Sequence, residues 1–577
     1  MTRYNANDAV SLDCQSRDCN IAPDGLSKNE AAIGNINNIE EYFTIRSQIL
    51  EREASVGFDW SCQHKASDNE YRANAILQTL RHNDNLRVYE RAPARQGYGG
   101  QEHRRVCGDH FLSNADLIEE TDVFKVAQKM PKGAHLHLHF NANLPPDFLL
   151  DIAKKMPRMF ITSTDPLISD NDYINYKKCE IQFRIRSEAD ELPGNLFSSE
   201  YERGQTMQFS QFIREFPSHY MKASVDDWLK SKLVFNEEEV HHCLQTVKGA
   251  WELFDKRTRM MKGLFNYETA FREYTKQCLQ EFVRDNIQYA EIRVNFMQTN
   301  QIWFDDGCGQ ITNEGMMDII VEECERFQEI NNEFYGLKII YCTPRSFSET
   351  QIAAALDECR EFKKKYPKYI AGYDLVGEEA AGKPLKDFIR QFLDFDKSCR
   401  DEGYSIPFLF HGGETLDIGT EVDQNLVDAI LLGAKRIGHG FSLPRHPSLI
   451  ELVKKQRICL EINPISNEEL NLIPRMSGHS VYTLLANDVH CTVNSDNPTL
   501  FRSTLSHDFY QIMVGSSSMT LHGWRQLVEW SLEHSCMNKD ELTASYGRWE
   551  DEWNRFLQWI IETYGEVEKL SDAETSP

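Results

Sequence analysis

The sequence predicts an α/β protein of the (β/α)8 TIM-type barrel class, with helices added before and after the barrel. Three observations lead to this prediction. Apolar runs of strand length recur along the chain, most of them alternate with stretches of helical periodicity, and several end in a histidine or a carboxylate. The eight runs are 133–139, 289–296, 338–342, 370–377, 407–410, 435–437, 458–462 and 489–493.

Further segments extend this core at both ends and within it. Residues 1–35 are polar and aperiodic, which predicts a disordered tail, whereas 36–130 should form a helical arm ahead of the barrel domain at 131–577. The gap between the first two strands is too long for one crossover, so an insertion is expected at roughly 155–250. Helices are expected at roughly 520–570. One face of the last helix should carry Trp549, Trp553, Phe556, Trp559 and Ile560.

Composition argues against several classes of partner. A net charge of −26 over 577 residues disfavours duplex nucleic acid or an anionic membrane surface, because binding phosphates requires a basic face. A small nucleotide could still bind a locally basic pocket. The fifteen cysteines are scattered without a CxxC pair, which is typical of reduced thiols. No secretory signal or apolar run of membrane-spanning length is seen, so we expect a cytoplasmic protein.

Three histidines share one face of the first predicted strand. Alternate strand residues point the same way, so His135, His137 and His139 lie opposite Leu136 and Leu138. A lone strand histidine is usually a core or surface residue, but three on one face favour a metal site. Because barrel sites lie at the carboxyl ends of strands, His137 and His139 are the expected ligands and His135 a deeper support.

Later strands end in side chains that could complete this site. His411 follows the run 407–410, and Glu414 comes three residues later. Taken alone, His411 could equally well cap a turn made by the glycines after it. His439 stands between two glycines, and Asp496 follows the last strand. Three histidines and an aspartate, with a glutamate and a histidine left unligated, suit a catalytic zinc that keeps one position for water.

Such a set has a large chemical effect. A bound metal can move the pKa of water from roughly 16 to about 7. That change corresponds to on the order of 12 kcal/mol, more than a single general base could supply. The unligated Glu414 and His439 suit general acid–base catalysis beside the ion. Zinc is preferred, although similar nitrogen and oxygen sites accept other first-row ions.

Together these motifs resemble the adenosine deaminase superfamily of metal-dependent aminohydrolases, and more narrowly its adenosine-deaminase-related growth factor branch. The resemblance runs from about residue 40 to the C-terminal helices and is most specific over 407–501. Segments typical of the branch are 130–133, 263–267, 289–293, 372–377, 436–441 and 463–467.

The resemblance implies a role for each site residue. Glu414 would protonate the ring nitrogen next to the reacting carbon, and His439 would orient and deprotonate the attacking water, with Asp496 helping to aim it. Gly377 would present its backbone to the purine. The implied reaction converts adenosine or a close 6-aminopurine nucleoside to an inosine-type product and ammonia, with one zinc per chain. The implied zinc ligands are His137, His139, His411 and Asp496.

Two departures from the family pattern leave the substrate open. Asn141 stands where an aspartate that touches the sugar is common, and Asn497 stands where a second acid usually contacts purine N7. An amide donates a hydrogen bond at any pH, whereas an acid must first be protonated. One alternative is therefore the same chemistry on an adenine nucleotide or another aminated substrate. A second is a non-enzymatic binding or signalling protein with a relict site.

The branch also implies a possible homodimer through the helical arm at 36–130. Its secreted members carry such an arm, but the missing secretion signal gives an extracellular role little support here.

Overall fold

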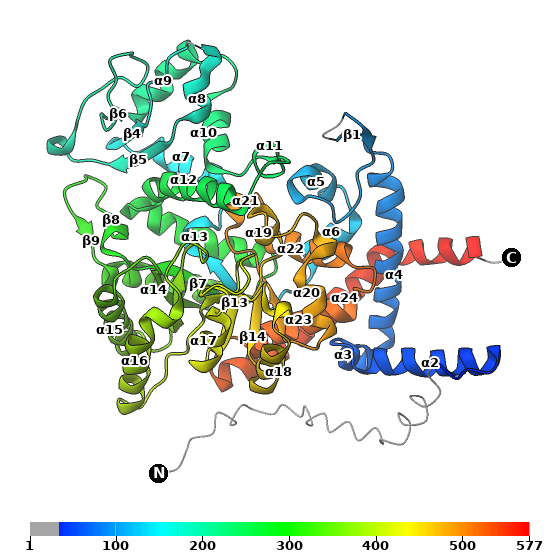
Figure 1. Ribbon diagram of the computed structural model, residues 1–577. Helices are drawn as coiled ribbons and strands as arrows, with labels where there is room; N and C mark the ends of the chain where they lie inside the picture. The colour runs from blue at the N-terminus through cyan, green and yellow to red at the C-terminus, as the bar shows by residue number, and fades with distance from the viewer. Residues whose placement is uncertain (1–33, 98–99, 170, 576–577) are drawn as a thin grey trace.

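The computed structural model describes residues 34–97, 100–169 and 171–575, so nearly all of the tail expected at 1–35 lies outside it. Two four-stranded parallel sheets form the centre of the molecule, with helices around them (Figure 1). Their strand orders are β11-β10-β7-β3 and β12-β13-β14-β15. The strands are β3 (Ala134–His139), β7 (Tyr289–Asn295), β10 (Gly336–Pro344), β11 (Ile370–Val376), β12 (His411–Gly412), β13 (Arg436–His439), β14 (Cys459–Ile462) and β15 (Cys491–Val493).

The two sheets are hydrogen-bonded to each other along both outer edges. Beyond β15, the amide of Asp496 donates to the His137 carbonyl of β3 at 3.2 Å. At the other edge, the Tyr373 amide of β11 donates to Pro407 O at 3.0 Å, and the Leu409 amide donates to Tyr373 O at 2.9 Å. The carboxyl ends of the eight parallel segments therefore gather on one side of the molecule.

One predicted strand is displaced. The ladder strand lies at 411–412 rather than at 407–410, where only an isolated bridge joins Phe408 to Tyr373. Pro407 has no amide hydrogen and cannot complete a ladder at that point. The displacement moves His411 from just after the strand to its first residue.

Helices fill the connections between the strands and bury the sheets. Helix α15 begins with a capping box between Ser348 and Gln351. A 3-10 turn, η6 (Leu385–Phe388), leads directly into α16. The main helices around the sheets are α13 (Glu268–Arg284), α14 (Asn313–Ile330), α15 (Glu349–Lys365), α16 (Ile389–Asp401), α17 (Asn425–Leu431), α18 (Pro447–Gln456), α20 (Ser480–Ala486) and α22 (Leu505–Gly515).

The segment before β3 is largely helical. Its helices are α2 (Ile39–Ser55), α3 (Trp60–Lys65), α4 (Asp68–Asp84), α5 (Phe111–Ile118) and α6 (Asp122–Lys129). Helix α4 buries one face, formed by Ala73, Ile76, Leu77 and Leu80. Helix α2 projects from the body and exposes Ile39 and Phe43 (Figure 1).

Between β3 and β7 the chain forms a separate small layer, at the top left of Figure 1. Strand β4 (Met159–Ser163) pairs antiparallel with β5 (Ile181–Ile185) and β6 (Met207–Gln208). Helices α9 (Phe209–His219), α10 (Val225–Leu233) and α11 (Glu237–Val240) follow, and then α12 (Val247–Phe265). A Cβ at Gly263 would lie 1.8 Å from the Phe183 carbonyl oxygen, so only glycine lets α12 lie this close to β5.

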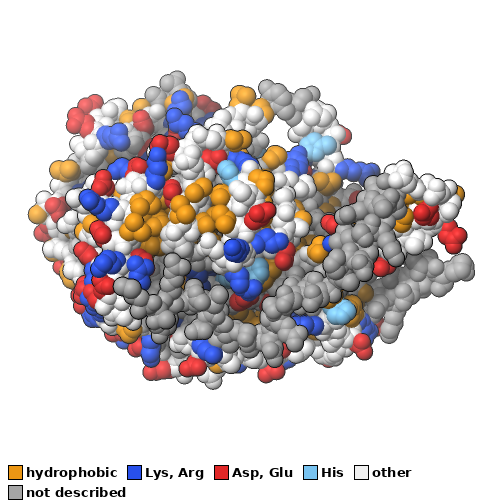
Figure 2. All heavy atoms as spheres, turned by 60° about the horizontal axis from the view of Figure 1, so that its bottom comes forward, with side chains coloured by type: hydrophobic (Ala, Val, Ile, Leu, Met, Phe, Trp, Pro, Cys, Tyr) orange, Lys and Arg blue, Asp and Glu red, His pale blue; other side chains and the backbone are white. Residues whose placement is uncertain are grey.

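Surface charge, cysteine state and helix hydrophobicity bear on the expectations from composition. On the face drawn in Figure 2, acidic and basic side chains are interspersed. The thirteen cysteines within the described ranges are free thiols. Among the residues that the structure describes, no helix has the length and apolarity needed to cross a membrane.

Two C-terminal helices, α23 (Leu521–Glu533) and α24 (Lys539–Thr575), pack against the sheets and the N-terminal helices. The aromatic stripe of α24 is buried as expected, except that Trp559 is only partly covered. Trp549 also donates a hydrogen bond from Nε1 to Pro131 O at 3.1 Å, which ties α24 to the segment leading into β3.

We expect Trp549→Ala to reduce the free energy of unfolding by about 3–5 kcal/mol, because it leaves a large cavity. Urea unfolding followed by far-ultraviolet circular dichroism measures the loss. Asp551→Ala, at an exposed position on the same helix, is the control and should change stability by less than about 0.5 kcal/mol. Equal stability of the two variants would contradict the packing role of Trp549.

Candidate active site

Four potential metal ligands converge at the carboxyl ends of the strands. They come from the end of β3, the start of β12 and the turn after β15, and their ligand atoms all lie within 4.8 Å of one another. Asp496 Oδ1 lies 3.2 Å from His139 Nε2 and 3.5 Å from His137 Nε2. The structure thus brings together the full ligand set that the sequence predicted: His137, His139, His411 and Asp496.

Two of these histidines are held by buried carboxylates. His137 Nδ1 lies 2.7 Å from Glu461 Oε2, and His411 Nδ1 lies 2.7 Å from Asp374 Oδ2. A carboxylate accepts the Nδ1 proton, which leaves the Nε2 lone pair of each ring free for a metal. His137 Nε2 is buried and has no hydrogen-bond partner within the described chain. An orphaned nitrogen of this kind is what an absent metal would leave.

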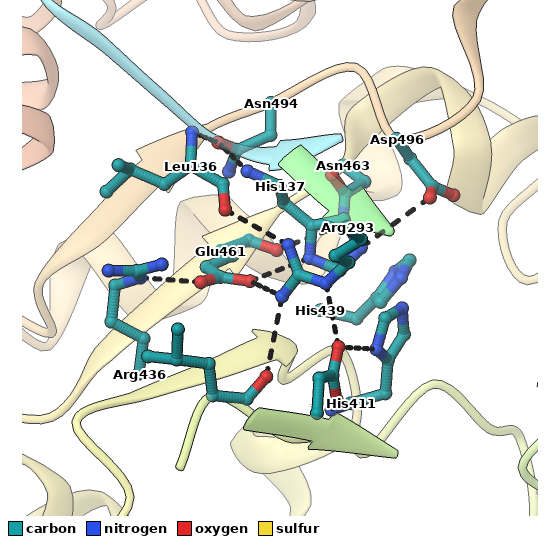
Figure 3. Close-up of polar contacts among 12 residues, drawn as sticks. Leu136, His137, Arg293, His411, Arg436, His439, Glu461, Asn463, Asn494 and Asp496 are labelled. Carbon is teal, nitrogen blue, oxygen red and sulfur yellow. Dashed lines mark hydrogen bonds and ion pairs between the residues drawn. The ribbon is translucent and has the colours of Figure 1, made fainter. Parts of the chain in front are cut away.

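Arg293 of β7 lies between the two carboxylates (Figure 3). Its Nε donates to Asp374 Oδ2 at 2.7 Å, its Nη2 to Glu461 Oε2 at 2.6 Å, and its Nη1 to the Leu136 carbonyl at 3.0 Å. Burial alone would raise the pKa of the Glu461 carboxyl, but the charges of Arg293 and Arg436 hold that pKa below its ordinary value. Both carboxylates therefore stay charged and keep accepting from the histidines.

Sequence reasoning did not assign a supporting role to Asp374, Glu461 or Arg293. The available signal was a charged residue inside an otherwise apolar strand run, as at Arg293 and Asp374. It also missed Glu379, which follows β11. Glu379 Oε1 accepts from the Gly413 amide at 3.0 Å, and its Oε2 accepts from the Glu414 amide at 2.5 Å. These bonds fix the loop that presents Glu414.

Glu414 and His439 lie beside the ligand cluster, and both approach Asp496. His439 Nε2 is 3.4 Å from Glu414 Oε1. Burial and, second, the Asp496 charge raise the pKa of the Glu414 carboxyl well above its ordinary value. Asp496 differs, because its interactions with His137 and His139 outweigh burial and keep its pKa well below the usual range. The surroundings thus shift the pKa values of two neighbouring carboxyl groups in opposite directions.

A hydrogen-bond relay fixes the tautomer of His439. The Val481 amide can only donate, and it donates to His479 Nδ1 at 2.9 Å. The proton of His479 is therefore on Nε2, which lies 3.0 Å from Asn467 Oδ1. The Asn467 amide nitrogen then donates to His439 Nδ1 at 3.0 Å. Neutral His439 consequently carries its proton on Nε2, the nitrogen that faces Glu414.

Two site residues occupy backbone conformations that non-glycine residues rarely adopt. The φ angle is +63° at His439 and +59° at Asp496. A left-handed conformation of this kind costs of order 1 kcal/mol and persists only where the surroundings impose it. At Asp496, Ser466 Oγ donates to Oδ2 at 2.7 Å and Asn497 Nδ2 donates to Oδ1 at 2.8 Å. These bonds hold the carboxylate toward the histidines.

A cavity of about 280 Å3 opens onto this group. All three residues expected to contact substrate line it: Asn141 after β3, Gly377 after β11 with φ +106°, and Asn497. The opposite wall comes from α12, which contributes Trp251, Phe254, Thr258, Arg259, Lys262 and Phe265. Sequence reasoning did not foresee that wall.

His135 lies outside the ligand cluster, as its deeper position on the strand suggested. Its Nε2 accepts from the Ser495 amide at 3.1 Å. It therefore supports the backbone immediately before Asp496.

The parallel sheets and the three histidines with an aspartate at their carboxyl ends place the chain among α/β proteins with a metal centre of hydrolytic type. A family model described as adenosine deaminase matches residues 233–545. Adenosine deaminase of Phlebotomus duboscqi is 33% identical over 459 residues, which cover 78% of this chain and 82% of that protein. The chain belongs to the adenosine deaminase family.

Two further comparisons extend over most of the chain. Adenosine deaminase 2 of Dictyostelium discoideum is 29% identical over 534 residues, covering 92% of this chain and 89% of that protein. The crystal structure of Arabidopsis ADAL complexed with IMP superposes with a TM-score of 0.51 and 13% identity, over 74% of this chain and 99% of that one. The structural likeness shows a shared α/β fold.

We expect Asp374→Asn to weaken zinc binding about 10- to 100-fold, because His411 and Arg293 lose a charged partner. Competition with a chromophoric chelator measures the affinity. Asp387→Asn, at an exposed position, should bind zinc like the wild type. Wild-type affinity in Asp374→Asn would show that the carboxylate does not support the site.

Proposed function

We propose that this chain is a zinc-dependent hydrolytic deaminase that converts adenosine, or a close 6-aminopurine nucleoside, to the corresponding 6-oxo product and ammonia. The observation that supports this most directly is the four-ligand cluster with Glu414 and His439 beside it in one cavity. Membership of the adenosine deaminase family supports the same reaction class.

The ligand cluster fits a zinc ion. Three imidazole nitrogens and one carboxylate form a common donor set for catalytic zinc, and the orphaned Nε2 of His137 faces the other ligands. His137, His139, His411 and Asp496 would hold the ion. When bound, zinc lowers the pKa of water and so makes a nucleophile available at neutral pH.

The unligated residues handle protons and orientation. The Glu414 carboxyl, whose raised pKa favours its neutral form, would donate its proton to the ring nitrogen beside C6 as the oxygen of a water that has lost one proton to solvent bonds to that carbon. The resulting Glu414 carboxylate would take the proton of the new C6 hydroxyl and pass it to the amine, so that the C6–amine bond breaks, the C6 carbonyl forms and ammonia leaves. His439 donates from Nε2 and thereby orients the water. This tautomer favours orientation over deprotonation of the water, the second role that the resemblance implied for His439.

The remaining cavity residues suit the purine and its sugar. Gly377 offers backbone to the ring, and Asn497 keeps a second amide hydrogen for a ring acceptor after donating one to Asp496. Asn141 also lines the cavity, and we assign it to the sugar, the part of the substrate that the family resemblance implies for this position.

We also propose that the two sheets close into one (β/α)8 barrel. Closure is supported by the hydrogen bonds along both outer edges, where isolated bridges pair Leu138 with Asp496 and Tyr373 with Phe408. In that barrel, 36–130 is the preceding arm, 155–250 the insertion, and α23 and α24 the additions at the end.

We expect Glu414→Gln to lower kcat by roughly 10²–10⁴-fold while zinc stays bound, because the amide cannot deliver a proton. Ammonia release from adenosine and metal analysis of the same sample give the two readouts. The control Glu421→Gln changes an exposed glutamate and should turn over normally. Undiminished ammonia release by Glu414→Gln would show that Glu414 is not the acid. If the metal-loaded wild type released no ammonia, the proposed function itself would be wrong.

An adenine nucleotide is a second candidate substrate, favoured by Lys262. Lys262 belongs to the α12 wall of the cavity, and its side chain forms no ion pair or hydrogen bond with the residues that the structure describes. Burial alone lowers the pKa of this lysine. With an amide rather than a carboxylate at Asn141, the sugar end of the cavity suits a phosphate better than the usual family pattern would.

If the substrate carries a phosphate, Lys262→Met should lower kcat/KM for adenosine 5′-monophosphate about 10-fold or more and leave adenosine within about 2-fold, because only the phosphate loses an ionic partner. Lys256→Met, on the exposed face of α12, serves as the control. If Lys262→Met lowered kcat/KM equally for both substrates, or for neither, Lys262 would have no part in phosphate recognition.

A further inference from the structure

A second group of histidines and carboxylates lies apart from the cavity. His110 precedes α5, His241 ends α11, and Glu468 lies in α19 (Pro464–Glu469). The ligand atoms of these three residues all lie within 4.8 Å of one another. Figure 1 shows the three helices side by side, so segments more than a hundred residues apart in the sequence meet at this point.

The contacts within this group are close. His110 Nδ1 lies 3.1 Å from Glu468 Oε1, and the rings of His110 and His241 are 4.0 Å apart between centroids. His241 Nε2 lies 3.6 Å from Oε1 of the adjacent Glu469. The side chains of Glu468 and Glu469 are 1% and 0% exposed.

Several polar atoms of this group have no partner. His241 Nε2 and both carboxylate oxygens of Glu469 are buried without a hydrogen bond from the described residues. An unsatisfied buried carboxylate is costly, and native proteins hold few of them. Three converging ligand atoms, from His110, His241 and Glu468, together with the unsatisfied Glu469 carboxylate 3.6 Å from His241 Nε2, indicate an ion that the polypeptide alone does not supply.

We propose that His110, His241, Glu468 and Glu469 bind a second divalent transition-metal ion, with zinc preferred. Two nitrogen and two oxygen donors suit a four-coordinate structural zinc, and the ion would neutralise two buried carboxylates. This site does not rest on the proposed function, because it shares no ligand with the cavity.

One neighbouring cation has to be accommodated. Arg475 Nη1 lies 2.8 Å from His110 Nε2, and Arg475 Nε lies 2.8 Å from Asp109 Oδ1. The ion therefore takes His110 through Nδ1, the nitrogen that already faces Glu468. Arg475 is half exposed and keeps Asp109 as its partner, so only its contact with His110 has to open.

The position of the site gives the ion a structural role. Helix α19 also carries Asn467, which donates to His439 in the tautomer relay. An ion held by Glu468 and Glu469 would anchor α5 and α11 to the same helix. It would thereby fix the helix that carries Asn467, the member of the relay that contacts His439.

Metal stoichiometry tests the proposal. The full chain is dialysed to equilibrium against a buffered series of free Zn2+, and bound zinc is counted by mass spectrometry. We expect two ions per wild-type chain and one in His241→Ala, while the exposed neighbour variant His242→Ala keeps two. One ion in the wild type, or two in His241→Ala, would overturn the second site.

A second variant guards against misfolding. Glu468→Gln preserves size and can still pair with His110, so it should fold while losing the second ion. Added zinc should raise the Tm of wild-type protein whose cavity site is already filled, and leave the Tm of Glu468→Gln unchanged. An equal rise in both would contradict the proposal. Loss of ammonia release by wild type carrying two ions would instead count against the deaminase function alone.

Discussion

The buried guanidinium of Arg293 is the interaction on which the metal centre depends. It contacts Asp374 on one sheet, Glu461 on the other and the backbone of β3, which carries two metal ligands. Each carboxylate must be charged to hold the Nδ1 proton of a histidine, yet burial favours its neutral form. Arg293 reverses that preference at both positions. One cation thereby orients His137 and His411 and joins the two sheets at the same point.

Arg436 compensates the charge of further buried carboxylates next to Glu461. Its guanidinium pairs with Glu461 and Glu291 at 2.6 Å each, all of them buried. Two arginines thus offset two of the three carboxylate charges, and the histidine Nδ1 protons supply further hydrogen bonds. Removing one partner from such a network leaves a buried charge and costs several kcal/mol, whereas the complete network is tolerated.

The sequence predicted the metal-binding residues better than the residues that support them. A histidine at the end of a strand run signals itself, because strand alternation and the common location of the carboxyl ends suffice to place it. Arg293 and Glu461 are 168 positions apart, and nothing local shows that they meet. Their pairing depends on the order and register of strands across both sheets. The late start of β12 has a local cause in Pro407, which could have been read from the sequence.

The role of His439 was likewise only partly predictable from the sequence. Its place between two glycines was visible, but its tautomer depends on a chain of donors that begins at a backbone amide of α20. The segment 463–467 was notable in the sequence without a reason. The structure supplies one, since Asn467 passes the hydrogen-bond direction from His479 to His439.

Under the proposed function, the departure at Asn497 relates to charge. Burial and, second, the Asp496 charge raise the pKa of the Glu414 carboxyl, whereas the pKa of Asp496 lies well below its usual range. An aspartate at 497 would add a third carboxyl beside Asp496 and would need a proton in order to donate to the ring. Asn497 donates without one, and its bond to Asp496 Oδ1 still leaves that oxygen a second lone pair for a metal. The amide therefore preserves the donor while lowering the negative charge at the substrate end of the cavity.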